Sequence, residues 1–432
     1  TVFALARMMR LRSGALADSE PVLTRVARAQ QRPLILMLGL LFHDLGKGMG
    51  PDHSARGAEL VRAYAQRIGL DSEDARDVEW LVQAHLRMSH ISQRRDLEDA
   101  ALIESFAREV STPERLEMLY LLTYVDMASV SPENWTRWKA HLLMSLFEKT
   151  HATMLAEGLG TPEHEQSVEQ RRERLASRLS PLAGEQASLV PEFVRELPER
   201  YVGTAQPDVA ARHLALWAGA RKTGFAGELH RPAAGEADLT LLASDRPGLL
   251  ALFTAALTAN GIDILGAEVN SLESGMALDI FVVRESGGGA PSAARWEAAR
   301  ADLLRLLSGA EDAHRLVQKR LRRASWASAA APAVETKVRV DDVSSSSMTI
   351  LDVLTQDRPG LLHTIADALH RAGVSIEVAR IATEGNRATD AFYLRDLGAR
   401  LPGSSSKIDD PARRAAVVQT VEAAIASLAG RG

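Results

Sequence analysis

Apolar residues recur at helical spacing through the first half of the chain, and the period changes in the second half. The first half predicts successive amphipathic helices, one of which, at residues 34–42, is apolar almost throughout. A more polar helical pattern covers residues 155–225. From about residue 236, short apolar runs predict strands that alternate with helices. The pattern therefore predicts an all-α half followed by an α+β half.

The α+β half contains an internal repeat. Asp-Arg-Pro-Gly-Leu-Leu at residues 245–250 returns at residues 357–362, and Gly261 and Gly373 follow at the same offset. Each copy is predicted to run strand, helix, strand, strand, helix, which is the ferredoxin-like order. A polar strand at residues 334–340 either closes the first copy or fills the vacant edge of the second.

The chain is long enough for several domains, because 432 residues exceed what one ordinary core supports. We predict a helical domain at residues 1–150 and a helical connector at residues 151–235. Two α+β domains of ferredoxin-like order are predicted at residues 236–342 and 343–432.

Composition narrows the class of protein. A hydrophobic content of 46% and a charged content of 25% are typical of soluble globular proteins. The net charge of -5 gives no basic footprint for nucleic acid. The absence of cysteine excludes disulfides and thiolate metal sites and is compatible with a reducing compartment. No apolar run predicts a membrane span or a signal peptide, and a chain that begins at Thr1 is expected to be part of a longer protein.

Candidate metal ligands accumulate after the apolar helix. His43 and Asp44 follow it directly, and an isolated pair of this kind more often caps a helix than binds metal. His53, His85 and Asp126 then occur on successive predicted helices. A carboxylate within an apolar helix, as at Asp126, needs compensation. Because neutral imidazole and carboxylate are natural ligands of divalent cations, the five residues predict a metal centre.

Such a centre is suited to hydrolysis, since bound divalent cations lower the pKa of water and can neutralise charge on oxygens such as those of a phosphate group. Lys47, Arg94 and Arg95 are candidates for contacts with those oxygens. For the two arginines, a solvated surface role is an equally good interpretation. The nitrogen and oxygen donors suit Mn, Fe or Zn without choosing among them.

Each copy of Asp-Arg-Pro-Gly-Leu is a candidate seat for a free amino acid. The Pro pre-sets the first helical turn and the Gly admits close approach of a ligand, while free amides at the helix start favour a carboxylate. Simple helix capping is the alternative interpretation. The candidate residues are Asp245, Arg246, Pro247, Gly248 and Leu249, with Asp357, Arg358, Pro359, Gly360 and Leu361 in the second copy.

The ligand order resembles that of the HD superfamily of metal-dependent phosphohydrolases. The resemblance implies that His43 and Asp44 form the adjacent pair, that Asp126 is the distal ligand, and that His53 and His85 serve a second metal. The family's leading His has no counterpart before His43.

A closer resemblance rests on four motifs: Phe-His-Asp-Leu-Gly-Lys-Gly at 42–48, Asp-His-Ser at 52–54, His-Leu-Arg-Met-Ser at 85–89 and Gln-Arg-Arg-Asp at 93–96. With the two later repeats, which resemble ACT domains, they resemble the bifunctional uridylyltransferase/uridylyl-removing enzymes of bacteria.

That family implies a multidomain fold: an all-α HD-type helical domain followed by two α+β ferredoxin-like ACT domains. It also implies a cytoplasmic enzyme that uses Mn or Mg to remove uridylyl groups from a tyrosine of the PII signal protein, under control by glutamine. ACT domains pair side by side and bind ligands at the seam, which adds Asn260, Asp263 and Glu377 as secondary candidates and allows self-association. The nucleotidyltransferase motif of the family has no counterpart here. The leading metal-binding His of the family would directly precede Thr1. We therefore expect metal to bind more weakly to this chain than to a longer one.

Two alternatives remain open. Stringent-response guanosine-polyphosphate hydrolases also join HD and ACT modules, although the immediate tandem of two ACT units disfavours that activity. The other alternative is a glutamine-sensing module whose metal site is catalytically incomplete.

Overall fold

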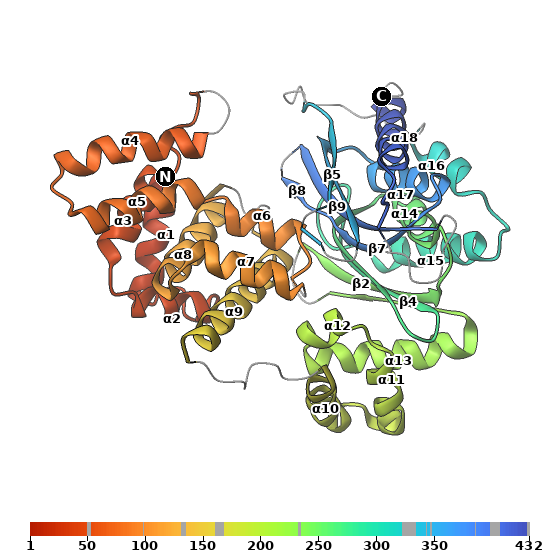
Figure 1. The fold of residues 1–432 in the computed structure, drawn as a ribbon. Helices are drawn as coiled ribbons and strands as arrows, with labels where there is room; N and C mark the ends of the chain where they lie inside the picture. The colour runs from red at the N-terminus through yellow and green to blue at the C-terminus, as the bar shows by residue number, and fades with distance from the viewer. Residues whose placement is uncertain are drawn as a thin grey trace. The chain divides into compact units, whose positions relative to one another are not determined.

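The computed structural model describes residues 1–49, 53–97, 99–130, 135–159, 168–231, 235–321, 334–342, 344–345, 348–384, 386–397 and 407–429. The chain divides into two compact units, Thr1–Glu165 and Gln166–Gly432 (Figure 1). Within the described ranges, no helix is long and apolar enough to cross a membrane.

The described residues of unit 1 form helices joined by turns and contain no strand, as the apolar spacing predicts. Its core contains the fully buried side chains of Leu36, Leu40, Leu81 and Tyr124. The helices are α1 (Val2–Ser13), α2 (Pro21–Ala29), α3 (Pro33–Phe42), α4 (His53–Arg67), α5 (Ser72–Ala84), α6 (Arg87–Arg94), α7 (Ala100–Val110), α8 (Pro113–Val130) and α9 (Arg137–Leu159). Because α9 continues to Leu159, the predicted domain boundary at residue 150 falls inside a helix.

Unit 2 begins with the helical connector, which packs on one face of the first sheet. Phe193 and Trp217 of the connector share a hydrophobic cluster with Leu242 and Leu278 of that sheet. The connector and the first sheet therefore share a hydrophobic core. Its helices are α10 (Val168–Leu179), η3 (Ser180–Leu182), η4 (Gly184–Leu189), α11 (Val190–Glu196), α12 (Glu199–Thr204) and α13 (Pro207–Thr223).

The first sheet is antiparallel, with strand order β1-β2-β4-β3. Residues 225–230, predicted as part of the helical connector, instead form β1 and pair with β2. This pairing satisfies the backbone groups that the β2 edge would otherwise leave open. The elements are β1 (Phe225–His230), β2 (Ala237–Ser244), α14 (Leu249–Ala259), β3 (Ile262–Ser271), β4 (Met276–Glu285), α15 (Ala293–Leu307) and α16 (Ala313–Leu321).

The second sheet repeats this order as β5-β6-β9-β7, with β8 paired to β9. The sequence left open which copy uses the strand predicted at residues 334–340, although the predicted range 236–342 includes it. In the structure β5 pairs with β6, so this strand fills the edge of the second sheet. Each sheet thus takes its edge strand from the segment before its repeat. The elements are β5 (Lys337–Asp341), β6 (Thr349–Gln356), α17 (Leu361–Arg371), β7 (Val374–Arg380), β8 (Thr383–Glu384), β9 (Arg387–Asp396) and α18 (Pro411–Ala429).

The two ACT-like domains lie side by side and share one core. Strand β3 contacts β7, and α14 contacts α17 (Figure 1). Phe253 and Phe281 of the first domain belong to the same hydrophobic cluster as Ile365 and Phe392 of the second. The predicted fold class, an all-α domain followed by two α+β domains, is confirmed.

Candidate metal centre

The end of α3 delivers the first two candidate ligands. The helix is apolar and closes at Phe42, and His43 follows in helical geometry with an exposed fraction of 1%. Its Nδ1–H donates to the carbonyl oxygen of Leu40 at 2.8 Å. Because a carbonyl can only accept, this bond fixes the tautomer and leaves Nε2 as the ring nitrogen that faces the other ligands.

His43 Nε2 lies between two carboxylates. Asp126 Oδ1 of α8 is 3.2 Å away and Asp44 Oδ2 is 3.3 Å away. Burial acts to lower the pKa of His43, but the hydrogen bonds to Asp126 and Asp44 outweigh it and raise the pKa to about 9. For Asp44, burial acts to raise the pKa, and the bonds from His43 and Lys47 outweigh it, so the pKa of Asp44 is well below its usual range.

A second group forms around the other side of Asp44. His85, the residue after α5, donates Nδ1–H to the carbonyl of Val82 at 2.7 Å, so its Nε2 carries a free lone pair. The His85 ring lies with its centroid 5.3 Å from that of His43 and 5.5 Å from that of His53, the first residue of α4. Burial, reinforced by repulsion from His43, lowers the pKa of His85 and keeps the ring neutral.

The structure therefore brings all five predicted ligands together, in two groups that share Asp44. One group is His43, Asp44 and Asp126, and the other is Asp44, His53 and His85. Within each group, the donor atoms lie within 4.8 Å of one another.

Three buried donor atoms of these residues are suited to bind a divalent cation. Asp44 Oδ1, His53 Nε2 and His85 Nε2 have no hydrogen-bond partner among the described residues. Such atoms are costly to bury unless a ligand satisfies them. Two imidazoles and a carboxylate oxygen are the donors that a borderline or hard divalent cation prefers. The shared carboxylate is compatible with one cation or with two.

The glycine of the His-Asp-Leu-Gly-Lys motif, Gly46, allows the start of α4 to pack closely against the motif turn. A Cβ on Gly46 would lie 2.1 Å from the carbonyl oxygen of His53 and 2.9 Å from the amide nitrogen of Gly57. The motif turn and the start of α4 are thus in backbone contact. That contact positions His53 in the second group.

The predicted phosphate-binding cations occupy different surroundings. Lys47 Nζ donates to Asp44 Oδ2 at 2.7 Å, and the Lys47 side chain is 62% exposed. Arg95, immediately after α6, is buried and donates to the carbonyl of Arg94. A solvated surface role is therefore wrong for Arg95. Contact of these three side chains with phosphate stays a prediction.

Comparison with known proteins gives the family to which the helical domain is related. The HD domain family matches residues 1–120. A "Bifunctional uridylyltransferase/uridylyl-removing enzyme" of Gluconobacter oxydans is 34% identical over 99% of this chain and 44% of its own length. Enzymes of the same description from Zymomonas mobilis and Azospirillum brasilense are 33% and 32% identical, over 91% and 92% of this chain and 42% and 43% of their own lengths. No solved structure matches the chain.

The chain carries an HD domain and is homologous to the uridylyl-removing enzymes. It spans less than half the length of the curated relatives that it matches.

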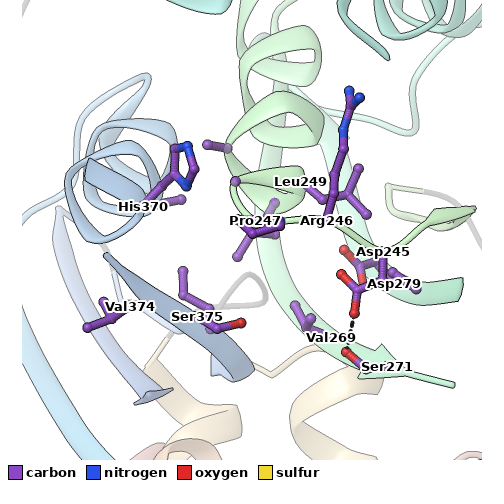
Figure 2. A pocket seen from close by; sticks show the side chains of 16 residues that line it. Asp245, Arg246, Pro247, Leu249, Val269, Ser271, Asp279, His370, Val374 and Ser375 are labelled. Atoms are coloured by element: carbon purple, nitrogen blue, oxygen red, sulfur yellow. Dashed lines mark hydrogen bonds between the residues drawn. The ribbon is translucent and has the colours of Figure 1, made fainter. Parts of the chain in front are cut away.

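In this chain, the first Asp-Arg-Pro-Gly-Leu copy lines a pocket between the two ACT-like domains. Figure 2 shows Asp245 and Ser271 of the first domain on one side, and His370 and Ser375 of the second on the other. Ser271 Oγ donates to Asp245 Oδ2 at 2.7 Å. Gly248 precedes α14 with φ of 82°, and a Cβ there would lie 3.0 Å from the His370 ring. Arg246, Pro247 and Leu249 complete the predicted set at this pocket.

The second copy has different surroundings. Burial, with repulsion from Asp263, raises the pKa of Asp357. A Cβ on Gly360 would meet Thr258 of α14 at 3.5 Å and Val317 of α16 at 3.6 Å. Helix α16 therefore packs close to the second copy, and Arg358, Pro359 and Leu361 do not line the pocket of the first.

The secondary candidates have partners within their own domains. Asn260 donates its amide to Asp302 at 2.8 Å. Asp263 accepts from Ser286 at 2.8 Å, and Glu377 accepts from Arg395. None of the three lines the first-copy pocket.

Sequence reasoning missed Asp279, a buried residue of β4 that also lines the pocket (Figure 2). A signal for it exists in the repeat. Asp279 lies between Ala277 and Phe281 in the pattern Ala-x-Asp-x-Phe, which returns at residues 388–392. His370 was missed because it comes from the other copy.

Proposed function

We propose that this chain hydrolyses the bond between a uridylyl phosphate and a tyrosine of the PII signal protein, and that glutamine regulates the reaction. The observation that carries the proposal is the pair of ligand groups around Asp44, with their buried and unsatisfied donor atoms. The homology to uridylyl-removing enzymes supports the proposed substrate class. A bacterial cytoplasmic setting is part of the same proposal.

The proposed ligands are His43, Asp44 and Asp126 for one position and Asp44, His53 and His85 for the other. Divalent cations such as Mn or Mg, with Fe and Zn as alternatives, would supply Lewis acidity and a water of lowered pKa. The protein's own part is to hold the donors. The carbonyl groups of Leu40 and Val82 keep the two imidazoles oriented, and exclusion of solvent around His43 strengthens local electrostatics.

Lys47 has a proposed role at the substrate phosphate. Its ammonium lies 2.7 Å from Asp44 Oδ2, so it is already beside the ligand groups, and its exposure leaves it accessible to a protein-bound phosphodiester. A tyrosine leaving group has a pKa of about 10 in water, so its departure as phenolate needs little help from an acid. Arg94 and Arg95 remain candidates for the same phosphate.

The proposed glutamine site is the pocket at Asp245. The amides at the start of α14 and the positive end of its dipole favour a carboxylate. The Asp245 carboxylate would pair with the ligand's amino group. Gly248 lets a ligand approach the backbone where a side chain would meet His370.

The test is release of UMP from uridylylated PII by the purified chain with Mn²⁺. We expect release by the parent and loss of at least about 100-fold in Asp126→Ala, with folding checked by circular dichroism. The same preparations are assayed with a guanosine polyphosphate. Pyrophosphate release without UMP release would replace the proposal with the alternative hydrolase. If the parent binds Mn²⁺ but releases product from neither substrate, the proposed hydrolysis is wrong. The alternative of a catalytically incomplete glutamine-sensing module would then be favoured.

A further inference from the structure

The turn between β3 and β4 is bonded to the pocket on one side. Ser271, the last residue of β3, donates to the Asp245 carboxylate at 2.7 Å. The amide nitrogen of Asp245 donates to the carbonyl of Gly275, just before β4, at 2.8 Å. Asp245 therefore holds both ends of the turn. A ligand amino group that pairs with Asp245 competes with the Ser271 hydroxyl for the same carboxylate.

The other side of the turn is held by Glu196, the last residue of α11. Ser274 Oγ donates to Glu196 Oε2 at 2.6 Å, and Trp217 Nε1 donates to the same oxygen at 3.0 Å. The amide of Glu273 donates to the Glu196 carbonyl at 3.2 Å. Glu196 is only 8% exposed. Hydrogen bonds to a buried carboxylate are strong and their loss leaves an uncompensated charge, so this carboxylate ties the turn firmly to α11 and α13.

Helix α13 has a second bond to the same sheet. His213, one turn before Trp217, is hydrogen-bonded through Nδ1 to Tyr201 Oη at 2.6 Å and through Nε2 to Thr240 Oγ1 at 3.0 Å. Thr240 belongs to β2, the strand that leads directly into Asp245. The connector thus contacts the sheet at β2 and at the turn, on both chain segments that position Asp245.

The packing of the connector agrees with this one-sided attachment. Leu272 and Met276, on the two sides of the turn, belong to the connector's hydrophobic cluster. Within the described residues, that cluster draws on the first sheet and contains no side chain of the second. Movement of the turn therefore changes contacts in the connector's own core.

We propose that the β3–β4 turn is a relay, in which Ser274 and Glu196 transmit occupancy of the Asp245 pocket to the connector helices. This inference rests on the proposed binding of an amino acid at that pocket. Glu196 acts as a positioning residue, since it touches the turn and not the ligand. An effector that draws Asp245 away from Ser271 loosens the turn and shifts the end of α11.

The test is hydrogen–deuterium exchange of the full chain over residues 190–196, with and without saturating glutamine. Ser274→Ala removes the hydroxyl from the turn and keeps the Trp217 bond. Glu196→Gln keeps an acceptor oxygen and is the conservative variant. Ser308→Ala is the matched control, because its exposed hydroxyl donates only to the nearby carbonyl of Arg305.

Without ligand, we expect Ser274→Ala to speed exchange in residues 190–196 by about 3- to 10-fold, as loss of one hydrogen bond does. Ser308→Ala should match the parent, and Glu196→Gln should lie closer to the parent than Glu196→Ala. With glutamine, exchange in residues 190–196 of the parent should become faster, because the bound ligand loosens the turn. Ser274→Ala should bind glutamine within about threefold of the parent, by calorimetry, and show no such change.

The outcomes separate the two proposals. A Ser274→Ala chain that binds glutamine and responds in residues 190–196 as the parent does would overturn the relay. So would a parent that binds glutamine without any change in these residues. If the parent binds no glutamine, the proposed effector fails, and unchanged ligand-free exchange in Ser274→Ala would then overturn the link itself.

Discussion

Gly46 offers a perturbation that should act on one ligand group and spare the other. It lies two residues after Asp44, and an added Cβ would lie 2.1 Å from the carbonyl oxygen of His53. Gly46 is not in the left-handed region, so alanine is acceptable to its own backbone. The effect of Gly46→Ala is therefore steric, and it falls on the start of α4.

The size of the displacement follows from the contact. Non-bonded Cβ contacts are rarely shorter than 3.0 Å, so the His53 backbone at the start of α4 must move by roughly 1 Å to relieve the overlap. Metal sites tolerate errors of about 0.2 Å in the positions of their ligands. A shift of roughly 1 Å therefore removes His53 from the group that it forms with Asp44 and His85. Overpacking of this kind costs about 1–3 kcal/mol of folding free energy.

The assay is Mn²⁺ binding by calorimetry, with the stoichiometry checked by elemental analysis. We expect Gly46→Ala to weaken binding at the His53 group by at least about 10- to 100-fold, as loss of orientation at a metal ligand does. His53→Ala should reproduce this result. Binding at the group of His43, Asp44 and Asp126 should persist in both variants, because none of its donors comes from α4.

Gly57→Ala is the matched control on the facing helix. Its Cβ would meet Val82 Cγ1 at 3.0 Å and the Gly46 amide nitrogen at 3.5 Å. A valine methyl group can move by the few tenths of an ångström required, so this variant should bind Mn²⁺ within about threefold of the parent. The reasoning is refuted if a folded Gly46→Ala chain binds Mn²⁺ as the parent does, or if it differs from His53→Ala.

Two further predictions concern unit 2. Burial lowers the pKa of His213 to about 3. Below pH 6.5, His213 therefore binds a proton in the unfolded chain but stays neutral in the folded chain. The free energy of unfolding falls by about 1.4 kcal/mol per pH unit from there toward pH 3. Denaturant unfolding at pH 8 and pH 5 should show the parent losing roughly 2 kcal/mol more than His213→Gln; equal losses would contradict the assignment. Asp245→Ala should weaken glutamine binding by at least about 10-fold in calorimetry. Asp357→Ala should leave it within about threefold, because Asp245 lines the pocket and Asp357 does not. The reverse order of effects would place the site at the second copy.

The candidate ligand set could be predicted from the sequence because its chemistry is carried by residue type and order. His43, Asp44 and Asp126 are unusual neighbours for apolar helices, and that mismatch is visible without a structure. That Asp44 belongs to both groups was not visible. It depends on the backbone contact of Gly46 with His53 and on the carbonyl of Val82, and neither contact leaves a mark in residue spacing.

Strand pairing was harder to predict than strand existence, for a physical reason. Strand β1 has one buried residue, Phe225, and five half-buried ones, so it lacks the alternation that reveals a strand. Strand β5 alternates enough to be recognised, but its partner is set by which sheet edge is open. The edges beside β2 and β6 are both filled from the preceding segment. This shared arrangement frees β3 and β7 to meet at the seam between the domains. The pocket at Asp245 is thus a product of pairing, since His370 reaches Gly248 only because the two repeats face each other across that seam.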